Sequence, residues 1–269
     1  MPKSKRTTKP KKPFSGYILN CEPSRDREKD WPMDNAEEAG LLAMPAIPPS
    51  KDLRAPWWKI GDQGATGSCV GWATADSVLR WHFVMAGRLP KNELLSMRYV
   101  WMAAKETDIY DSRPTTFIEM DGTSLKAALD ITRKFGVVRD TTLPFTSGVL
   151  YRGRVITFYA LAAQRRIASY FNLGGNPADW RRWIAMNGPI LTRLDVDDTW
   201  YSATDNKGKL DVYKAETADG GHAVALVGYT RSHLIVRNSW GTSWGDKGFG
   251  YASDAYARAA FTESYGVVL

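Results

Sequence analysis

The stretch GDQGATGSCVGWA at residues 61–73 places Cys69, one of only two cysteines in the chain, behind a glycine-rich turn and at the head of an apolar run. From Ser68 to Gly87 apolar residues recur at helical spacing, which predicts a helix with Ser68 at its N-cap and Cys69 in its first turn. The free N–H groups and positive dipole end of a helix N-terminus stabilise an anion. Because the thiolate is the nucleophilic form of cysteine, this setting favours a reactive Cys69 over a structural thiol.

The composition is that of an ordinary globular protein. The chain has 269 residues, of which 43% are hydrophobic and 24% charged, and no apolar run approaches the ~18 residues of a membrane span. The net charge of +7 is concentrated in residues 1–13, which carry six basic residues and no acidic one. This Lys-, Thr- and Pro-rich segment cannot bury apolar surface, so we expect a disordered, solvated tail. An anionic partner for the tail, nucleic acid or a membrane surface, is the alternative.

The number of cysteines and the N-terminal sequence indicate the cellular compartment in which the protein is expected to act. No apolar stretch of signal-peptide type follows the basic tail, so we do not expect an ordinary secretory signal. Cys21 and Cys69 could form at most one disulfide, and we prefer Cys69 as a nucleophile. We therefore expect a reducing, cytoplasmic compartment, with an effector exported by a non-classical route as the alternative.

The tail is followed by an extension and then by one large domain. Residues 14–45 mix acidic, basic and apolar residues without periodicity and are interpreted as an N-terminal extension or a short propeptide-like segment. Residues 46–269 are expected to form the domain, which begins with a helical lobe at about 59–150. Apolar spacing and capping residues predict three helices in this lobe, over residues 68–86, 92–105 and 124–135.

After about residue 150 the pattern becomes strand-like. Apart from one predicted helix at 177–187, the apolar runs are short and separated by Gly, Asp and Asn: ILTRLDV, HAVALVGYT, HLIVRNSW and GFGYAS. We expect a largely antiparallel β lobe at about 151–269. The predicted fold class is therefore α+β, with two lobes and a cleft between them.

Three histidines are candidate bases for Cys69. His82 lies several turns further along the predicted helix, too distant to reach Cys69, and His233 has charged and polar neighbours that are typical of a surface. His222 follows two glycines and leads into a long apolar strand, which would hold it rigidly. A neighbouring imidazolium lowers a thiol pKa, so we favour His222 as the partner of Cys69, with a structural histidine as the alternative.

A histidine base needs a third group that orients its ring. Asn238 ends a strand sixteen positions after His222; if the two strands pair, its amide can accept the far N–H of the ring, and Trp240 can screen that bond from water. A turn-forming Asn is the alternative. Gln63 precedes Cys69 across a loop with two glycines, and its amide can donate to an oxyanion together with the Cys69 backbone N–H.

These segments resemble the papain-like cysteine peptidases. DQGATGSCVGWA is similar to the family's Gln-to-Cys segment, GGHAVALVGY to its histidine strand and RNSWGTSWGDKGFGY to its asparagine block, in the same order. The resemblance runs from Pro48 to the C-terminus and implies the two-lobe papain-like fold. No cofactor is implied, and the scattered cysteines and histidines lack the spacing of a metal site.

The resemblance also implies roles for individual residues. It makes Cys69 the nucleophile, His222 the general base and then acid, and Asn238 the orienting residue. Gln63 with the Cys69 N–H would form the oxyanion hole, and Trp240 would shield the triad. The substrate backbone and leaving group would be contacted by Gly67, Ser68, Asp121, Gly122, Gly221 and Trp244.

Two departures from the family pattern stand out. Thr66 occupies the position of a family cysteine, so the usual disulfide of the helical lobe cannot form, which agrees with a reducing compartment. The 45 or so residues before the domain are too short for the helical inhibitory propeptide common in the family, and we interpret them as an autoinhibitory segment, a permanent belt or a targeting arm. Cys21 in this segment is interpreted as an incidental thiol, with a regulatory thiol as the alternative.

The leading functional hypothesis is a cysteine endopeptidase that acts on protein or peptide substrates through a Cys69 acyl-enzyme. An acyl transferase or peptide ligase on the same scaffold shares the chemistry up to the acyl-enzyme. A non-catalytic binding or adaptor module that uses the basic arm is the alternative from a different class.

Overall fold

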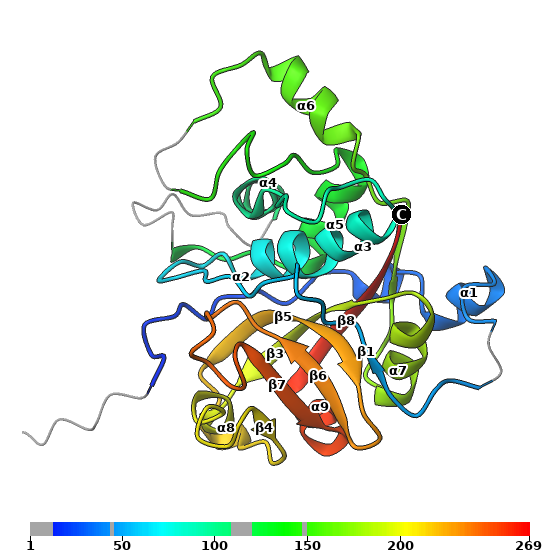
Figure 1. Ribbon diagram of the computed structural model, residues 1–269, viewed down its shortest axis with the longest axis vertical. Coiled ribbons are helices and arrows are strands. Elements are labelled where there is room, and N and C mark those ends of the chain that lie inside the picture. The colour runs from blue at the N-terminus through cyan, green and yellow to red at the C-terminus, as the bar shows by residue number, and fades with distance from the viewer. Residues whose placement is uncertain (1–12, 44–45, 109–119, 147–149) are drawn as a thin grey trace, which may run out of the picture.

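The computed structural model describes residues 13–43, 46–108, 120–146 and 150–269. Helices α2 to α6 lie above an eight-stranded sheet in the view of Figure 1. This is the predicted α+β arrangement of two lobes. The predicted tail falls, except for Pro13, outside the described residues. Among the helices within those ranges, none combines the length and the apolar character needed to cross a bilayer.

The central helix carries Cys69 at its start. Three consecutive pieces form it: α2 (Cys69–Gly71), a π-helical segment η2 (Trp72–Leu79) and α3 (Arg80–Met85). It ends before Gly87, which has a φ of +69°, as the sequence predicts. At Gly71 the backbone of α4 approaches so closely that a side chain would collide with the Met97 carbonyl and Trp101.

The other helices of this lobe are α4 (Met97–Thr107), α5 (Leu125–Lys134) and α6 (Val155–Ala163). Ser96 and Ser124 cap α4 and α5 by accepting hydrogen bonds from Tyr99 N and Ala127 N. The predicted start of α4 at residue 92 is wrong, because the chain before Ser96 is extended and Leu95 bridges to Arg139.

The β lobe is built on one sheet with strand order β2-β8-β3-β5-β6-β7-β4, and β1 pairs with β5. All pairings are antiparallel except that of β4 with β7. The strands are β1 (Lys51–Asp52), β2 (Ser169–Asn172), β3 (Ile190–Val196), β4 (Lys209–Leu210), β5 (Gly220–Tyr229), β6 (His233–Arg237), β7 (Phe249–Ser253) and β8 (Phe261–Val268). The remaining elements are η1 (Arg27–Lys29), α1 (Met33–Glu38), α7 (Pro177–Met186), α8 (Asp198–Tyr201), η4 (Ala215–Thr217) and α9 (Asp254–Ala260).

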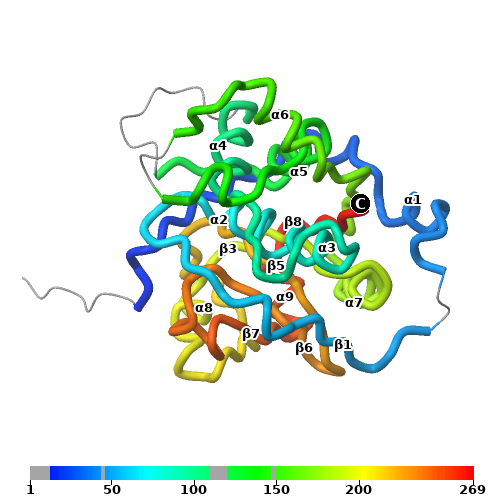
Figure 2. The backbone as a smooth tube through the Cα atoms, turned by 45° about the horizontal axis from the view of Figure 1, so that its top comes forward, coloured from blue at the N-terminus to red at the C-terminus, as the bar shows by residue number. Residues whose placement is uncertain are grey.

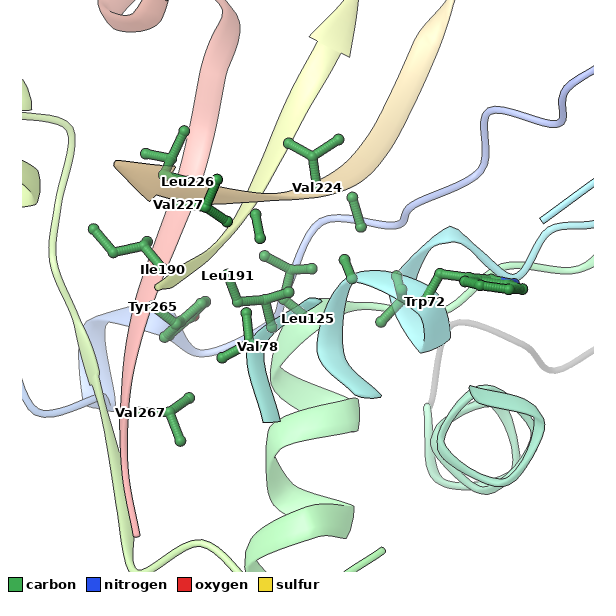
Figure 3. Close-up of a cluster of buried hydrophobic side chains, with 14 of the residues drawn as sticks. Trp72, Val78, Leu125, Ile190, Leu191, Val224, Leu226, Val227, Tyr265 and Val267 are labelled. Carbon is green, nitrogen blue, oxygen red and sulfur yellow. The ribbon is translucent and has the colours of Figure 1, made fainter. Parts of the chain in front are cut away.

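The core lies where the central helix and α5 meet the sheet. Figure 3 shows Val78 of η2 and Leu125 of α5 beside Leu191 of β3. These side chains are essentially inaccessible to solvent. Packing both lobes into one apolar cluster holds the start of the central helix against β5.

Helix α6 packs with the helical lobe, although the predicted lobe boundary at about residue 150 assigns it to the β lobe. Its Phe158 ring contacts Tyr99 of α4 at 5.1 Å, and the Val137 N–H donates to the Arg165 carbonyl at 3.1 Å. The boundary therefore falls after α6. The sequence VITFYALAA lacks a polar face, so it shows no helical periodicity that could reveal a helix here.

The N-terminal segment crosses between the lobes. We call residues 14–30 the strap. In Figures 1 and 2 its dark-blue trace passes between the helices and the sheet before reaching α1. Glu22 forms a parallel bridge with Ser124 at the start of α5, and Cys21 N donates to the Gly221 carbonyl of β5 at 3.0 Å. The strap thus touches both lobes near the N-terminus of the central helix.

Candidate active site

Cys69 is the first residue of the central helix and is fully buried beneath the strap. Ser68 occupies the N-cap position, as the sequence predicts, but its side chain makes no capping bond. Its hydroxyl instead lies 2.6 Å from the Thr66 hydroxyl. The Ser68 side chain therefore does not occupy the backbone N–H groups of the first helical turn. These groups point out of the end of the helix that carries Cys69.

His222 enters the site from β5 and bonds to Asn238, which follows β6. Its Nε2 lies 2.8 Å from Asn238 Oδ1, and both residues are buried. The strands β5 and β6 pair in antiparallel register, which brings these residues together as the sequence argument requires. Nδ1, on the other side of the ring, is the nitrogen left to interact with Cys69. The Trp240 ring lies 5.0 Å from the imidazole and separates it from solvent.

The surroundings of Cys69 favour its thiolate. The hydrogen bond with the Cys21 thiol, together with His222 and the Ala223 backbone N–H, holds the pKa of Cys69 well below its ordinary value, although burial acts in the opposite direction. Burial and the same hydrogen bond raise the pKa of Cys21 well above its ordinary value. Cys21 therefore stays protonated beside the Cys69 thiolate, and its thiol donates a long hydrogen bond of 3.9 Å to the Glu22 carbonyl.

Gln63 is held rigidly beside the triad. Its Oε1 accepts from the Ser239 hydroxyl at 2.8 Å, and its Nε2 donates to the Thr66 carbonyl at 3.0 Å. The Thr66 hydroxyl returns a bond to the Gln63 carbonyl at 2.8 Å. Thr66, at the position of the family's cysteine, thus fixes this loop through hydrogen bonds in place of a disulfide.

A buried ion network joins the central helix to the strand that carries Asn238. Arg237 Nη2 donates to Asp76 Oδ2 at 2.6 Å and to the Lys59 carbonyl at 2.7 Å. Asp76 Oδ1 accepts from Arg80 Nη1 at 2.9 Å. Since Arg237 ends β6 and immediately precedes Asn238, the network sets the position of Asn238 relative to the helix that begins at Cys69.

The residues expected to contact a substrate backbone line the groove that the strap fills. Side chains at Gly67 and Gly122 would collide with Asn20, and one at Gly221 would collide with the Cys21 carbonyl. Asn20 Nδ2 also donates to the Met120 carbonyl, next to Asp121. Ser68 lies at this groove but is fully buried.

Trp244 does not fit its predicted place on the leaving-group side. It is fully buried, and its Nε1–H donates to the Trp200 carbonyl at 3.1 Å. Its ring packs against Trp200 at 4.4 Å, behind Trp240. Trp240 itself is covered by the strap, through Tyr17 at 4.7 Å and Phe14 at 6.0 Å.

The other two histidines lie outside the site. His82 is buried in α3, and burial lowers its pKa to about 4. His233 is paired with Asp211 at 2.9 Å at the surface.

Several residues that shape the groove have no local sequence signal. Arg193 Nε donates to the Cys21 carbonyl at 2.8 Å, and Glu263 Oε1 accepts from Ser24 N at 2.8 Å. Arg193 on β3 and Glu263 on β8 are both buried, and their burial beside the strap is the feature that marks them. The alternation of inward and outward side chains along a strand could have placed a charge at an inward position of β3 or β8. It could not have identified the strap as the partner of that charge.

Comparison with known proteins places this architecture in a family. The sequence profile described as papain family cysteine protease matches residues 47–263. A cathepsin L-like proteinase of Fasciola hepatica is 24% identical over 214 residues, 76% of this chain and 60% of the relative. Cysteine proteinase 3 of Entamoeba histolytica is 26% identical over 211 residues, 77% of this chain and 63% of the relative.

A solved structure shows the same fold. Xylellain, a cysteine protease from Xylella fastidiosa, superposes with a TM-score of 0.75 at 20% identity, over 97% of this chain and 99% of that one. The chain belongs to the papain family of cysteine proteases. It spans about 60% of the length of the two curated relatives.

Proposed function

We propose that this protein is a cysteine endopeptidase that hydrolyses protein or peptide substrates through an acyl-enzyme on Cys69. The Cys69 thiolate attacks the scissile carbonyl carbon, and the carbonyl electron pair moves to oxygen. The His222 imidazolium protonates the leaving amine as the C–N bond breaks. His222 then removes a proton from water, which attacks the thioester and releases the acid and the thiolate.

The bond of 2.8 Å between His222 and Asn238 is the observation that carries this proposal. It fixes the ring so that the second nitrogen faces Cys69. The burial of both partners keeps water from competing for this hydrogen bond. Gln63 supports the oxyanion role, because its amide has a second hydrogen beyond the one given to Thr66. A developing oxyanion could accept this hydrogen together with the Cys69 N–H.

We further propose that the strap makes this a closed form of the enzyme. Cys21 N and Glu22 N donate to the Gly221 and Thr123 carbonyls at 3.0 and 3.1 Å. An extended substrate would bind by adding its backbone to these same groups. The strap and a substrate therefore compete for the groove, which supports the autoinhibitory interpretation of residues 14–45.

The test compares wild type with Cys69→Ala on a diverse peptide pool, with His233→Ala as a control outside the site. We expect cleavage by wild type and the control, and none by Cys69→Ala. Cleavage that persists in Cys69→Ala would contradict the proposal. Product masses with an added amine distinguish hydrolysis from acyl transfer, and intact masses show whether the N-terminal segment is removed in wild type only.

A further inference from the structure

The backbone of Cys21 is fixed on both sides. Its N–H donates to the Gly221 carbonyl at 3.0 Å, and its carbonyl accepts from Arg193 Nε at 2.8 Å. The neighbouring Glu22 N–H donates to Thr123 O at 3.1 Å. Cys21 is 2% exposed, so its side chain has a defined place inside the groove.

The strap places Cys21 between the loop that leads to Cys69 and the strand that carries His222. A side chain at Gly67, two residues before Cys69, would collide with Asn20, and Cys21 N–H bonds to the Gly221 carbonyl, next to His222. β6 pairs with β5 only from Ala225 onward, so this edge of β5 is open to the strap.

Cys21 and Cys69 are therefore neighbours in this part of the groove. Both are buried free thiols, and they are the only two cysteines of the chain. Each of them shifts the pKa of the other, which agrees with this placement. A second thiol in contact with a nucleophilic thiolate is the arrangement in which oxidation of the nucleophile is resolved as a disulfide. A serine or an alanine at position 21 could occupy the groove equally well but could not do this.

We propose that Cys21 and Cys69 form a dithiol site that hydrogen peroxide oxidises to a disulfide, which bonds the strap reversibly over the active site. The existence of the site is independent of turnover, whereas its consequence for activity rests on the proposed peptidase function. The disulfide would both hold the enzyme closed and protect Cys69 from irreversible oxidation.

The reaction balances with peroxide as the oxidant. Local opening of the strap admits peroxide, and the Cys69 thiolate attacks one oxygen as the O–O bond breaks, which gives a sulfenic acid and hydroxide. The strap closes, Cys21 sulfur attacks the Cys69 sulfur, the S–S bond forms and the S–O bond breaks. The hydroxide released from peroxide takes up the proton that Cys69 has given up, and the hydroxide released from the sulfenic acid takes up the proton of Cys21. Two thiols lose two electrons in all, and peroxide is reduced to two waters.

The charges around Cys21 suit the second step. Burial, the Cys69 thiolate and the more weakly acting Glu263 raise the pKa of Cys21, whereas Arg193 lowers it. Conversion of Cys69 to a neutral sulfenic acid removes the larger of the two negative influences on Cys21 and leaves Glu263 and Arg193 in place. Cys21 therefore becomes a better nucleophile only after Cys69 has been oxidised.

The experiment treats reduced full-length protein with hydrogen peroxide and follows intact mass and a non-reducing peptide map. We expect wild type to lose the mass of two hydrogens, to yield a linked Cys21–Cys69 peptide and to return to the starting mass with dithiothreitol. Cys21→Ser and Cys21→Ala should instead gain two oxygens at Cys69, and dithiothreitol should not reverse this. If the peptidase function holds, activity recovered after reduction should be about tenfold greater in wild type than in Cys21→Ser.

Two results would overturn the proposal: sulfinic acid at Cys69 of wild type without a linked peptide, or oxidation of Cys21→Ser that reverses like that of wild type. Because mass is the primary measurement, a chain that forms the disulfide but cleaves no peptide would reject the peptidase function alone. A chain that cleaves peptides but forms no disulfide would reject the dithiol site alone.

Discussion

Tyr17 of the strap stacks on Trp240, with ring centroids 4.7 Å apart and ring planes 12° from parallel. Trp240 in turn covers the His222 imidazole at 5.0 Å. The residue that shields the catalytic hydrogen bond from water is thus also the platform on which the strap closes. Strap binding and shielding of the triad are therefore coupled through one side chain.

Removal of this stacking should open the groove. We expect Tyr17→Ala to raise the initial rate of peptide hydrolysis by about 3- to 10-fold, because aromatic stacking contributes about 0.5–1.5 kcal/mol beyond the buried area. Tyr17→Phe keeps the ring and loses only the bond from the hydroxyl to Asp62, so it should have a smaller effect. Equal rates for wild type and Tyr17→Ala would show that the strap does not limit access.

Asn238→Ala should lower kcat by about 10²-fold, the lower range for a positioned acid–base group. The reason is that His222 would lose the acceptor that orients its ring. His233→Ala is the matched control, because it removes a histidine whose acceptor, Asp211, lies at the surface. Steady-state rates of both variants check this prediction. An unchanged kcat in Asn238→Ala would show that Asn238 does not position His222.

Asp76→Ala should destabilise the fold by about 3–5 kcal/mol, because it leaves Arg237 and Arg80 buried without their counter-charge. Urea unfolding provides the measurement. Asp211→Ala, which breaks an exposed pair, should cost less than about 1 kcal/mol. Similar costs for the two variants would show that the buried network does not join the lobes.

His82 should make stability depend on pH between its unfolded value of 6.5 and its folded value of about 4. Burial disfavours the charged ring in the folded state, whereas the unfolded chain binds the proton. The full stability is therefore present above pH 6.5 and is lost progressively as the pH falls to about 4, by about 3 kcal/mol.

His82→Asn, which retains a donor for the Pro189 carbonyl, should flatten this part of the profile. Urea midpoints measured across that pH range check it. An equal slope in wild type and His82→Asn would assign the pH dependence to other groups.

The sequence predicted those features that depend on local signals. β3 was predicted at its observed bounds because the run ILTRLDV is separated from its neighbours by Gly188 on one side and by aspartates on the other. The pairing of His222 with Asn238 followed from two adjacent apolar strands joined by a short turn.

Features that depend on contacts distant in sequence could not be predicted. Cys21 is 48 positions from Cys69, and nothing in the residues around it indicates that the strap enters the groove. The buried place of Trp244 depends on Trp200 and Trp240, which come from separate segments. The apolar sequence of α6 is compatible with a strand, and its packing on aromatic residues distant in sequence, such as Tyr99, does not show in its own residues.

The central claim is that Cys69 carries the acyl group. Rapid acid quenching of the full-length protein after mixing with a peptide ester, followed by mass mapping, tests this directly. We expect an acyl adduct on the Cys69 peptide that forms before the acid product and decays as the product accumulates. Product formation without any adduct on Cys69, or an adduct on a different residue, would contradict it.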